Sequence, residues 1–526
     1  MSHSRLGSLE GLRELEGLEH ARIGEHDLVR DPPGRYGQHL QGVWRPPTAD
    51  FSREFQSNNL KNRKLFAIVS FMEAMSSLNA RTMLVSFRAR NVRSFRDDIE
   101  FSLEATAMSE DGVPRDVPWR QGGSHPLRIL PAAGIFGANA SGKSNFLRVL
   151  GDMRSLVLTS FSGDRTRRLD VQPFRLDDDY ANAPSTYDID LVLDGIRYEY
   201  GFTLDFKQVI NEYARHYPRG KAATLFNRDL LQVQLGEKDR AKGRVVSEIL
   251  RSNSLYLSAA AAADHPGLEP LYQWFQSNLM LCEASSRESR WAYTTRLMSK
   301  PENRELVLAM LQAADLGITD ARVREPEPEM LDQISRLVSA IQRETRREGE
   351  SEGSDPFNFD TTSLLRIALS HRGKSGEIEF DTHEESLGTL VWLGLIGPVL
   401  DALAAGAVLL VDELESSLHP ALVKQLVRIF QGKRTNPNGA QLIFNSFEAG
   451  LLGNSVDDRI LGRDQVWFTE KLFNGSSRLY SLTDLGPRKA EAVTRRYLDG
   501  RYGATPIIND AEFDALAVKV SSGLAE

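Results

Sequence analysis

Eight consecutive residues carry the clearest chemical pattern in the sequence, GxxxxGK[ST]. They are Gly137, Ala138, Asn139, Ala140, Ser141, Gly142, Lys143 and Ser144, and Asn145 follows them. Glycines in this pattern let backbone N–H groups converge on phosphate oxygens, the lysine adds a positive charge, and the last hydroxyl can ligate Mg²⁺. An apolar run precedes the pattern and an amphipathic run follows it, which indicates a strand, a loop and a helix. We predict that residues 137–145, here called the phosphate loop, bind the phosphates of a nucleotide.

Two acidic residues far along the chain are the second candidate group. The apolar run 407–411 ends in Asp412 and Glu413, and Asp412 lies 269 residues beyond Lys143. A buried strand with acids at its carboxyl end is where α/β sheets bind ligands. We predict that Asp412 and Ser144 hold Mg²⁺, that Glu413 polarises an attacking water, and that Lys143 and Glu413 are the catalytic residues. A gap of this length requires an insertion between the two groups.

A serine and a glycine could supply a further anion contact. Ser386 and Gly388 come just before an apolar run at residues 390–400, for which we expect a helix. A Ser-x-Gly sequence at a helix N-terminus can donate hydroxyl and backbone N–H groups to an anion. It can equally be an ordinary helix cap, and the sequence leaves both interpretations open.

The stretch 388–411 is apolar enough to raise the question of a membrane. Its single charged residue is Asp401, and Gly394, Gly397 and Pro398 interrupt it. A membrane-spanning helix needs about 20 predominantly apolar residues. We expect a buried helix followed by a buried strand, and no membrane contact.

These candidate residues must be positioned by a chain that we divide into four segments. Regular patterns begin at Met83, so residues 1–82 are an extension of doubtful structure. Strands and the phosphate loop occupy 83–206, where Asp-Gly at 194–195 between two β-rich runs predicts a hairpin. A polar and mostly helical insertion is expected over 207–355. Strands, the acidic pair and a C-terminal hairpin and helix make up 356–526.

Composition limits the class of protein. The chain has 526 residues, of which 41% are apolar and 26% charged, as in an ordinary globular protein. The net charge of −8 argues against a large nucleic-acid face, so any direct DNA contact must be a local patch. Cys282 is the only cysteine, which excludes an intrachain disulfide and fits a reducing cytosol. The first 30 residues show no secretory signal, and we expect a cytoplasmic location.

The order of the motifs resembles a known class of ATPases. Residues 91–95, Asn-Val-Arg-Ser-Phe, resemble the N-terminal motif of SMC and RecF-like ABC ATPases. That motif, the phosphate loop, a long insertion, Ser386-Leu387-Gly388, the acidic pair and residues 416–420 together look like an ABC-type ATPase head. More narrowly, the chain resembles bacterial stand-alone AAA-type ATPases typified by RloA and AriA, which are related to RecF and OLD heads. Residues 497–506 look like their C-terminal signature, so the resemblance spans about 83–506.

The resemblance implies an α/β fold, with a mixed β-sheet flanked by helices, and an ATP-sandwich mechanism. ATP and Mg²⁺ would be the cofactors, and two heads would pair head to tail or form a higher oligomer. Ser386 and Gly388 of one head would touch the γ-phosphate bound at Lys143 of the other, and hydrolysis would release the pair. The family is associated with anti-phage defence, in which a separate nuclease-like effector is the expected partner.

One position departs from the family pattern. The relatives usually have a histidine near the γ-phosphate after the strand that follows the acids, and here Phe447 stands in that place. We therefore expect slow ATP hydrolysis. Gln172 is our candidate for the glutamine that senses Mg²⁺ and water in such ATPases. Two alternatives to a defence switch remain, a RecF-like DNA-repair ATPase and an ATP-bound assembly scaffold with little turnover.

Overall fold

The computed structural model describes residues 82–326 and 365–521, except 118, 120–125, 164–165, 219 and 238, together with 329, 332–333 and 336–337. Internal contacts divide the chain into two compact units. The described part of the larger unit lies within 82–294 and 384–521, and that of the smaller unit within 295–383. Residues 1–81, which make up nearly all of the expected extension, lie outside the described residues.

The first sheet of the larger unit is antiparallel and has seven strands among the described residues. In spatial order they are β10 (Gln232–Leu235), β9 (Ala223–Asp229), β8 (Val209–Tyr217), β7 (Ile196–Leu204), β6 (Ser185–Leu193), β1 (Met83–Arg90) and β2 (Ile99–Ser102). The predicted hairpin is confirmed, because Asp194 and Gly195 join β6 to β7 with φ angles of 49° and 79°, as a type I′ turn requires.

The phosphate loop and the acidic pair both follow strands of the second sheet in the larger unit. The six strands of this sheet in the described residues are, in order, β11 (Leu279–Cys282), β15 (Val408–Val411), β16 (Gln441–Asn445), β5 (Ala132–Phe136), β17 (Val466–Lys471) and β18 (Ser477–Ser481). All neighbouring pairs are parallel except β17 with β18. Since only β16 separates β5 from β15, the phosphate loop after β5 and the acids after β15 leave the same edge of the sheet.

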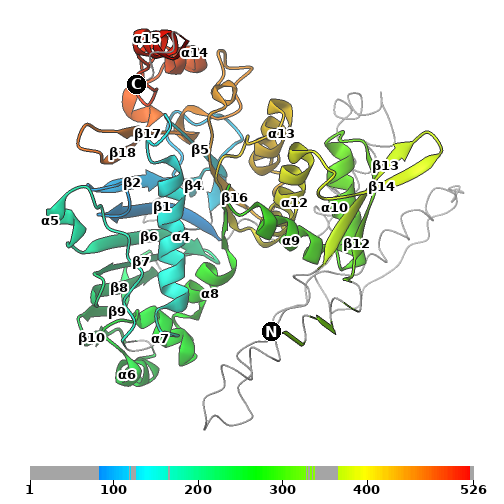
Figure 1. Ribbon diagram of the computed structural model, residues 1–526. Helices are drawn as coiled ribbons and strands as arrows, with labels where there is room; N and C mark the ends of the chain where they lie inside the picture. Colours follow the sequence, from blue (N-terminus) through cyan, green and yellow to red (C-terminus); the bar gives the residue numbers. More distant parts are fainter. Residues whose placement is uncertain are drawn as a thin grey trace, which may run out of the picture. The chain divides into compact units, whose positions relative to one another are not determined.

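Helices cover the two sheets (Figure 1). In the described part of the larger unit they are α4 (Lys143–Thr159), α5 (Asp178–Ala181), α6 (Arg240–Ile249), α7 (Tyr256–Ala262), α8 (Glu269–Ser277), α9 (Arg287–Leu297), α12 (Leu387–Ala405), α13 (Pro420–Gln431), α14 (Val493–Leu498) and α15 (Asp510–Ser521). Short 3₁₀ turns η3 (Ala449–Leu451), η4 (Arg463–Gln465) and η5 (Leu482–Leu485) and the small ladder β3 (Arg115–Val117) with β4 (Leu127–Ile129) complete it.

The helix that follows the phosphate loop packs between the two sheets. On α4, Phe146 lies 5.0 Å from Phe101 of β2 between ring centroids, and Phe101 lies 4.9 Å from Trp467 of β17. These aromatic side chains belong to one continuous buried core. Burial of this kind stabilises the helix far more than its intrinsic propensity does, so the core fixes the direction in which α4 presents its N-terminus.

The apolar stretch that resembled a membrane span is α12. This described helix is long and apolar enough to cross a bilayer, but most of its apolar window is buried inside the protein. Ser386 caps its N-terminus, and Gly406 ends it with a φ of 66°. A buried core helix, as we expected from the interrupting Gly394 and Pro398, accounts for the composition.

The described residues of the smaller unit include helix α10 (Pro301–Ala313) and an antiparallel sheet. α10 is followed by β12 (Ile318–Arg324), β13 (Arg366–Gly373) and β14 (Gly376–Asp381). Arg324 pairs with Glu379 and with Asp381 across the strands. The exposed face of this sheet is therefore a ladder of alternating charges.

The expectation of a mostly helical segment over 207–355 is wrong for its first part. Residues 209–235 form β8, β9 and β10, which extend the first sheet beyond β7. Many side chains on these strands are polar and exposed, because one face of the sheet is open. The polar residues weaken the alternation of apolar residues from which strands are predicted. α6 to α10 do form a helical stretch from 240 to 313, interrupted by β11.

Candidate functional site

The phosphate loop connects β5 to α4 and has the backbone that its glycines allow. Gly142 has a φ of 112°, and a Cβ atom there would lie 2.5 Å from the Ser477 hydroxyl oxygen. On the other side of the loop, the Ser141 hydroxyl shares a hydrogen bond of 2.7 Å with the Thr469 hydroxyl. Only glycine fits at position 142, because both the φ angle and the neighbouring serine exclude a side chain.

Lys143 is buried at the N-terminus of α4, and groups of its own loop hold it. Its ammonium donates to the carbonyl oxygens of Gly137 at 2.7 Å and Ala138 at 3.0 Å. Its Nζ atom also lies 3.7 Å from the centre of the Phe447 ring, within the range of a cation–π contact. Burial lowers the pKa of Lys143 to about 8, while the carboxylates of Glu415, Glu413 and Asp412 act in the opposite direction.

The predicted metal ligands are joined by a residue that the sequence analysis did not identify. Asn445, at the end of β16, donates its amide to Asp412 Oδ1 at 2.5 Å and to Ser144 Oγ at 3.5 Å. Its Oδ1 accepts the backbone N–H of Glu413 at 2.6 Å. Asn445 is fully buried, and it touches both candidate groups. Its position at the carboxyl end of the apolar run beside the acidic strand was the signal that could have revealed it.

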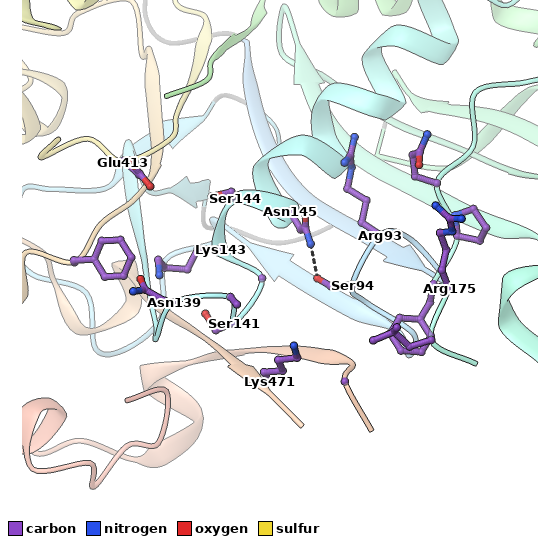
Figure 2. A pocket seen from close by; sticks show the side chains of 18 residues that line it. Arg93, Ser94, Asn139, Ser141, Lys143, Ser144, Asn145, Arg175, Glu413 and Lys471 are labelled. Carbon is purple, nitrogen blue, oxygen red and sulfur yellow. Dashed lines mark hydrogen bonds between the residues drawn. The ribbon is translucent and has the colours of Figure 1, made fainter. Parts of the chain in front are cut away.

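One cavity of about 530 Å³ brings the phosphate loop, Glu413 and Phe447 together with three other segments (Figure 2). This volume falls in the range of small-molecule sites. Residues that line it come from the N-terminal motif, the phosphate loop, the segment before α5, and the ends of β15, β16 and β17, among them Arg93, Ser94, Asn139, Lys143, Ser144, Asn145, Gln172, Arg175, Glu413, Phe447 and Lys471. The site therefore depends on residues almost 400 positions apart in the chain.

The N-terminal motif lies against the phosphate loop. The Arg93 guanidinium forms two hydrogen bonds of 2.6 Å with the Asp152 carboxylate on α4. The Ser94 hydroxyl accepts from the Asn145 amide at 2.9 Å, as the dashed line in Figure 2 shows. Gln172 lines the same cavity, and its carbonyl accepts the Arg93 backbone N–H. These contacts place Arg93, Ser94 and the backbone of Gln172 beside the phosphate loop.

Ser386 and Gly388 do not line this cavity. Ser386 is exposed, and its hydroxyl accepts the backbone N–H of Thr389 at 3.1 Å, which is the geometry of a helix cap. Gly388 lies close to the Ser417 carbonyl, because a Cβ atom there would approach that oxygen to 2.8 Å. Within one chain, these two residues are thus separate from Lys143.

Phe447 lies in the place that we assigned to it, after β16 and in the cavity. Its ring is half exposed and covers Lys143. Its backbone N–H donates to Glu415 Oε1 at 2.6 Å, and the other oxygen of this carboxylate is buried without a hydrogen bond. The acidic segment after β15 therefore fixes the backbone from which the aromatic ring projects.

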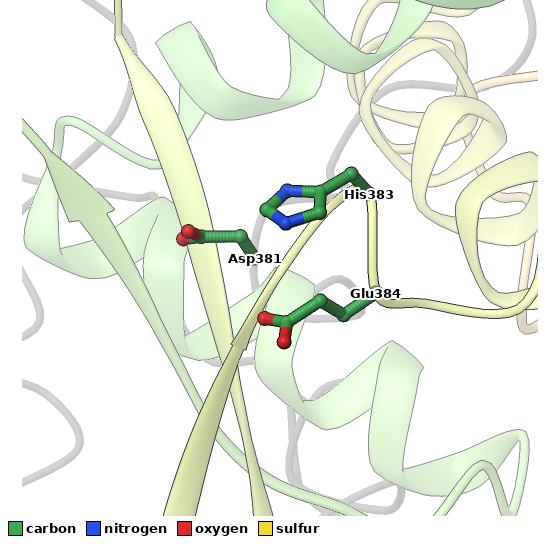
Figure 3. Close-up of side chains that lie close together, drawn as sticks. All are labelled: Asp381, His383 and Glu384. Atoms are coloured by element: carbon green, nitrogen blue, oxygen red, sulfur yellow. The ribbon is translucent and has the colours of Figure 1, made fainter.

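A separate group of possible metal ligands follows β14. Asp381, His383 and Glu384 have ligand atoms within 4.8 Å of one another (Figure 3). His383 and Glu384 are exposed and Asp381 is partly exposed. Exposed groups of this composition are common in the absence of a metal, and we assign no metal role to them.

Solved structures with detectable likeness include SMC head domains. An SMC head bound to the C-winged helix domain of ScpA has 13% identity and a TM-score of 0.34, with 76% of this chain and 97% of that chain covered. The SMC head domain from Thermotoga maritima has 10% identity and a TM-score of 0.33, with coverages of 76% and 98%. An Smc head with an extended coiled coil, bound to the C-terminal domain of ScpA derived from Pyrococcus furiosus, has 13% identity and a TM-score of 0.32, with coverages of 77% and 98%. No curated protein matches the chain.

A family model matches residues 132–446, from β5 and the phosphate loop to the residue after Asn445. Its description reads "AAA domain, putative AbiEii toxin, Type IV TA system". The match covers more than half of the chain and includes both candidate groups. The α/β fold with a phosphate loop and a mixed sheet, expected from the motifs, is confirmed. The chain belongs to this family of AAA-domain ATPases.

Proposed function

We propose that this chain binds Mg²⁺-ATP in the cavity around Lys143, hydrolyses it slowly, and pairs with a second copy while ATP is bound. The observation that carries the proposal is that Asn445 joins Ser144, Asp412 and Glu413 by hydrogen bonds, while Lys143 lines the same cavity as Ser144 and Glu413. A phosphate loop and an acidic strand end serve this chemistry only when they share one cavity. Membership of an AAA family supports nucleotide-dependent ATPase activity.

Different side chains bind the phosphates, hold the metal ion and activate the water, each according to its chemistry. Lys143 turns from the Gly137 and Ala138 carbonyls toward the β- and γ-phosphates, and the loop N–H groups hold the phosphate oxygens. The hydroxyl of Ser144 and the carboxylate of Asp412 are oxygen ligands of the kind that suit Mg²⁺, and Asn445 holds both. When bound, the metal ion supplies charge neutralisation for the phosphates. Glu413 orients and polarises the attacking water.

The proposed pairing rests on Ser386 and Gly388. Both lie outside the cavity of their own chain, and Ser386 is exposed at the N-terminus of the 19-residue helix α12. A helix N-terminus with an exposed hydroxyl favours an anion, so it can contact the γ-phosphate held by a second copy. ATP then stabilises the dimer by binding across it, and hydrolysis weakens it.

Phe447 favours a variant of this proposal in which the ATP-bound dimer is long-lived and acts as an assembly scaffold. The ATPases that this chain resembles usually have a histidine here, which can form a hydrogen bond with a phosphate or a water. A phenyl ring cannot. The proposed biological setting is anti-phage defence with a separate nuclease-like effector, and it rests on the resemblance to RloA and AriA alone.

Calorimetry with Mg²⁺-ATP tests the binding step. Lys143→Ala should abolish tight binding, because it removes the main phosphate charge. Lys433→Ala, at an exposed lysine away from the cavity, should bind as the wild type does. Equal affinity of Lys143→Ala and wild type would contradict the assignment of the phosphate loop.

Light scattering tests the pairing step. In Glu413→Gln, which should bind ATP without hydrolysing it, Mg²⁺-ATP is expected to double the mass of the particle. Adding Ser386→Arg should prevent this increase and leave a monomer that still binds Mg²⁺-ATP, though more weakly, because the contact from the second copy is lost. A mass that does not respond to ATP, or a dimer that tolerates Ser386→Arg, would contradict the head-to-tail arrangement.

A further inference from the structure

The C-terminal signature, which the proposed function leaves unused, lies beneath the phosphate loop. We call residues 493–504, comprising α14 and the turns after it, the C-terminal segment. Its Tyr497 is buried and stacks on Phe468 at 5.4 Å between ring centroids and 19° between ring planes. The same ring meets the edge of Phe136 at 6.3 Å. Phe136 immediately precedes Gly137, so Tyr497 packs against the strand end from which the loop begins.

Both strands that contact Tyr497 continue into groups that shape the loop. After Phe468 comes Thr469, whose hydroxyl bonds Ser141 and whose carbonyl would lie 2.4 Å from a Cβ atom on Gly137. Burial raises the pKa of Tyr497 to about 12, and the nearby backbone N–H of Gly137 acts on this hydroxyl in the opposite direction. The Gly137 carbonyl in turn holds the Lys143 ammonium. The start of the loop is thus enclosed by Tyr497, Thr469 and Lys143.

The C-terminal segment also forms hydrogen bonds with the chain just after Phe447. The Thr494 hydroxyl donates to the Ala449 carbonyl at 2.8 Å, and the Thr494 backbone N–H donates to the Gly453 carbonyl at 3.0 Å. One short segment therefore contacts both the start of the phosphate loop and the segment that carries the aromatic ring over Lys143.

Glycines with positive φ angles and hydrogen-bonded tyrosines fix the conformation of the C-terminal segment. Gly500 and Gly503 have φ angles of 72° and 70°, and a Cβ atom on Gly503 would lie 2.9 Å from the Tyr480 hydroxyl. That hydroxyl donates to the Tyr502 carbonyl at 2.7 Å, and the Tyr502 hydroxyl donates to Glu491. These contacts fold the chain back so that Tyr497 faces the loop.

We propose that Tyr497 is a positioning residue for the phosphate loop, and that the C-terminal segment thereby sets the affinity for Mg²⁺-ATP. The phenol and its stacked ring hold Gly137 while Lys143 exchanges the loop carbonyls for phosphate oxygens. A loop held in this way loses less conformational freedom on binding, so preorganisation raises affinity. The inference rests on the proposed function, since it presumes that the cavity binds ATP.

The test uses the full-length chain and two matched hydroxyl deletions. Tyr497→Phe keeps the aromatic packing and removes only the hydroxyl at Gly137. Tyr256→Phe removes another buried hydroxyl, which donates to the Gly243 carbonyl away from the cavity. For each, calorimetry gives the Kd for Mg²⁺-ATP, steady-state assays give KM and kcat, and scanning calorimetry gives the midpoint of unfolding.

We expect Tyr497→Phe to raise Kd and KM about fivefold, equivalent to ~1 kcal/mol, with kcat unchanged. Tyr256→Phe should lower the unfolding midpoint by at least as much as Tyr497→Phe does, and should bind Mg²⁺-ATP like the wild type. Wild-type affinity in Tyr497→Phe, or equal weakening in both variants, would overturn the inference. Absence of Mg²⁺-ATP binding by the wild type would overturn the proposed function itself, a distinct result.

Discussion

Lys143 is the residue whose environment must change most when nucleotide binds. Its ammonium is buried, rests on the carbonyls of Gly137 and Ala138, and lies under the Phe447 ring. Burial disfavours the charged form and lowers the pKa of Lys143 to about 8. The phosphates of a nucleotide favour the charged form, so binding is coupled to proton uptake above this pH.

The affinity for Mg²⁺-ATP should therefore fall as the pH rises through about 8. Below pH 8 Lys143 is already protonated in the free protein, and above pH 8 binding must take up a proton. Linkage then predicts a loss of roughly tenfold between pH 7 and pH 9. Calorimetry at several pH values measures it, with Lys143→Ala as the control whose residual affinity should not change. A wild-type affinity that is constant to pH 9 would show that Lys143 keeps its charge.

We expect Phe447 to limit how fast the chain hydrolyses ATP. Its backbone is held by Glu415, so a substituted side chain would project from the same place. Removing one positioned hydrogen-bonding group from an active site typically costs about 10²–10³ in rate. We expect Phe447→His to raise kcat at least about tenfold and Glu413→Gln to lower it. If the wild type already turns over at roughly tens per second, a common enzyme rate, Phe447 only packs against its neighbours.

At the scale of elements, β8 and β9 are joined to α7 by a buried ion pair. Glu212 and Arg228 are both fully buried, with 3.2 Å between Oε2 and Nη1. Glu212 also accepts the backbone N–H of Leu257, and Arg228 donates to the Ser254 carbonyl. Because every contact crosses between elements, the pair determines how the strands that extend the first sheet meet the helices after them.

Removing one member of this pair should be far more damaging than removing an exposed neighbour. Arg228→Met leaves Glu212 buried without its partner, which costs about 3–5 kcal/mol of unfolding free energy. The control is Arg215→Met, because Arg215 on β8 is half exposed and lies 3.8 Å from Glu199. Exposed pairs contribute under ~1 kcal/mol. Urea unfolding measures both, and equal losses would contradict a special role for the buried pair.

At the scale of the whole molecule, the first described strand of the larger unit lies inside the first sheet, one strand from its edge. β1 pairs with β2 on one side and β6 on the other, and the Leu84 N–H donates to Gln441 Oε1 at 2.7 Å. Gln441 begins β16 of the second sheet, so this contact joins the two sheets at the residue after Met83. The hydrogen bonds of β1 are satisfied by residues within 82–521.

We therefore predict that a chain truncated to begin at Met83 folds and binds Mg²⁺-ATP with wild-type affinity. Circular dichroism and calorimetry compare it with the full-length chain. A second truncation, beginning at Asn91, removes β1 from between β2 and β6 and should fail to fold. Loss of solubility or of nucleotide binding in the Met83 truncation would show that the preceding residues pack on the ATPase.

The sequence by itself determined the local parts of this protein. The phosphate loop, the acidic strand end, the Asp194-Gly195 turn and the start of α12 follow from φ preferences, hydrophobic period and capping, which act between near neighbours. Tertiary structure alone decided that Asn445 joins Ser144 to Asp412, that Phe447 covers Lys143, and that Tyr497 supports Gly137. It also decided that residues 209–235 add strands to the first sheet rather than helices. The physical reason is that these contacts join residues hundreds of positions apart, or depend on which face of a sheet is buried. Local patterns of residue types do not predict which distant residues come into contact. Close packing and the pairing of buried polar groups in the folded core determine these contacts.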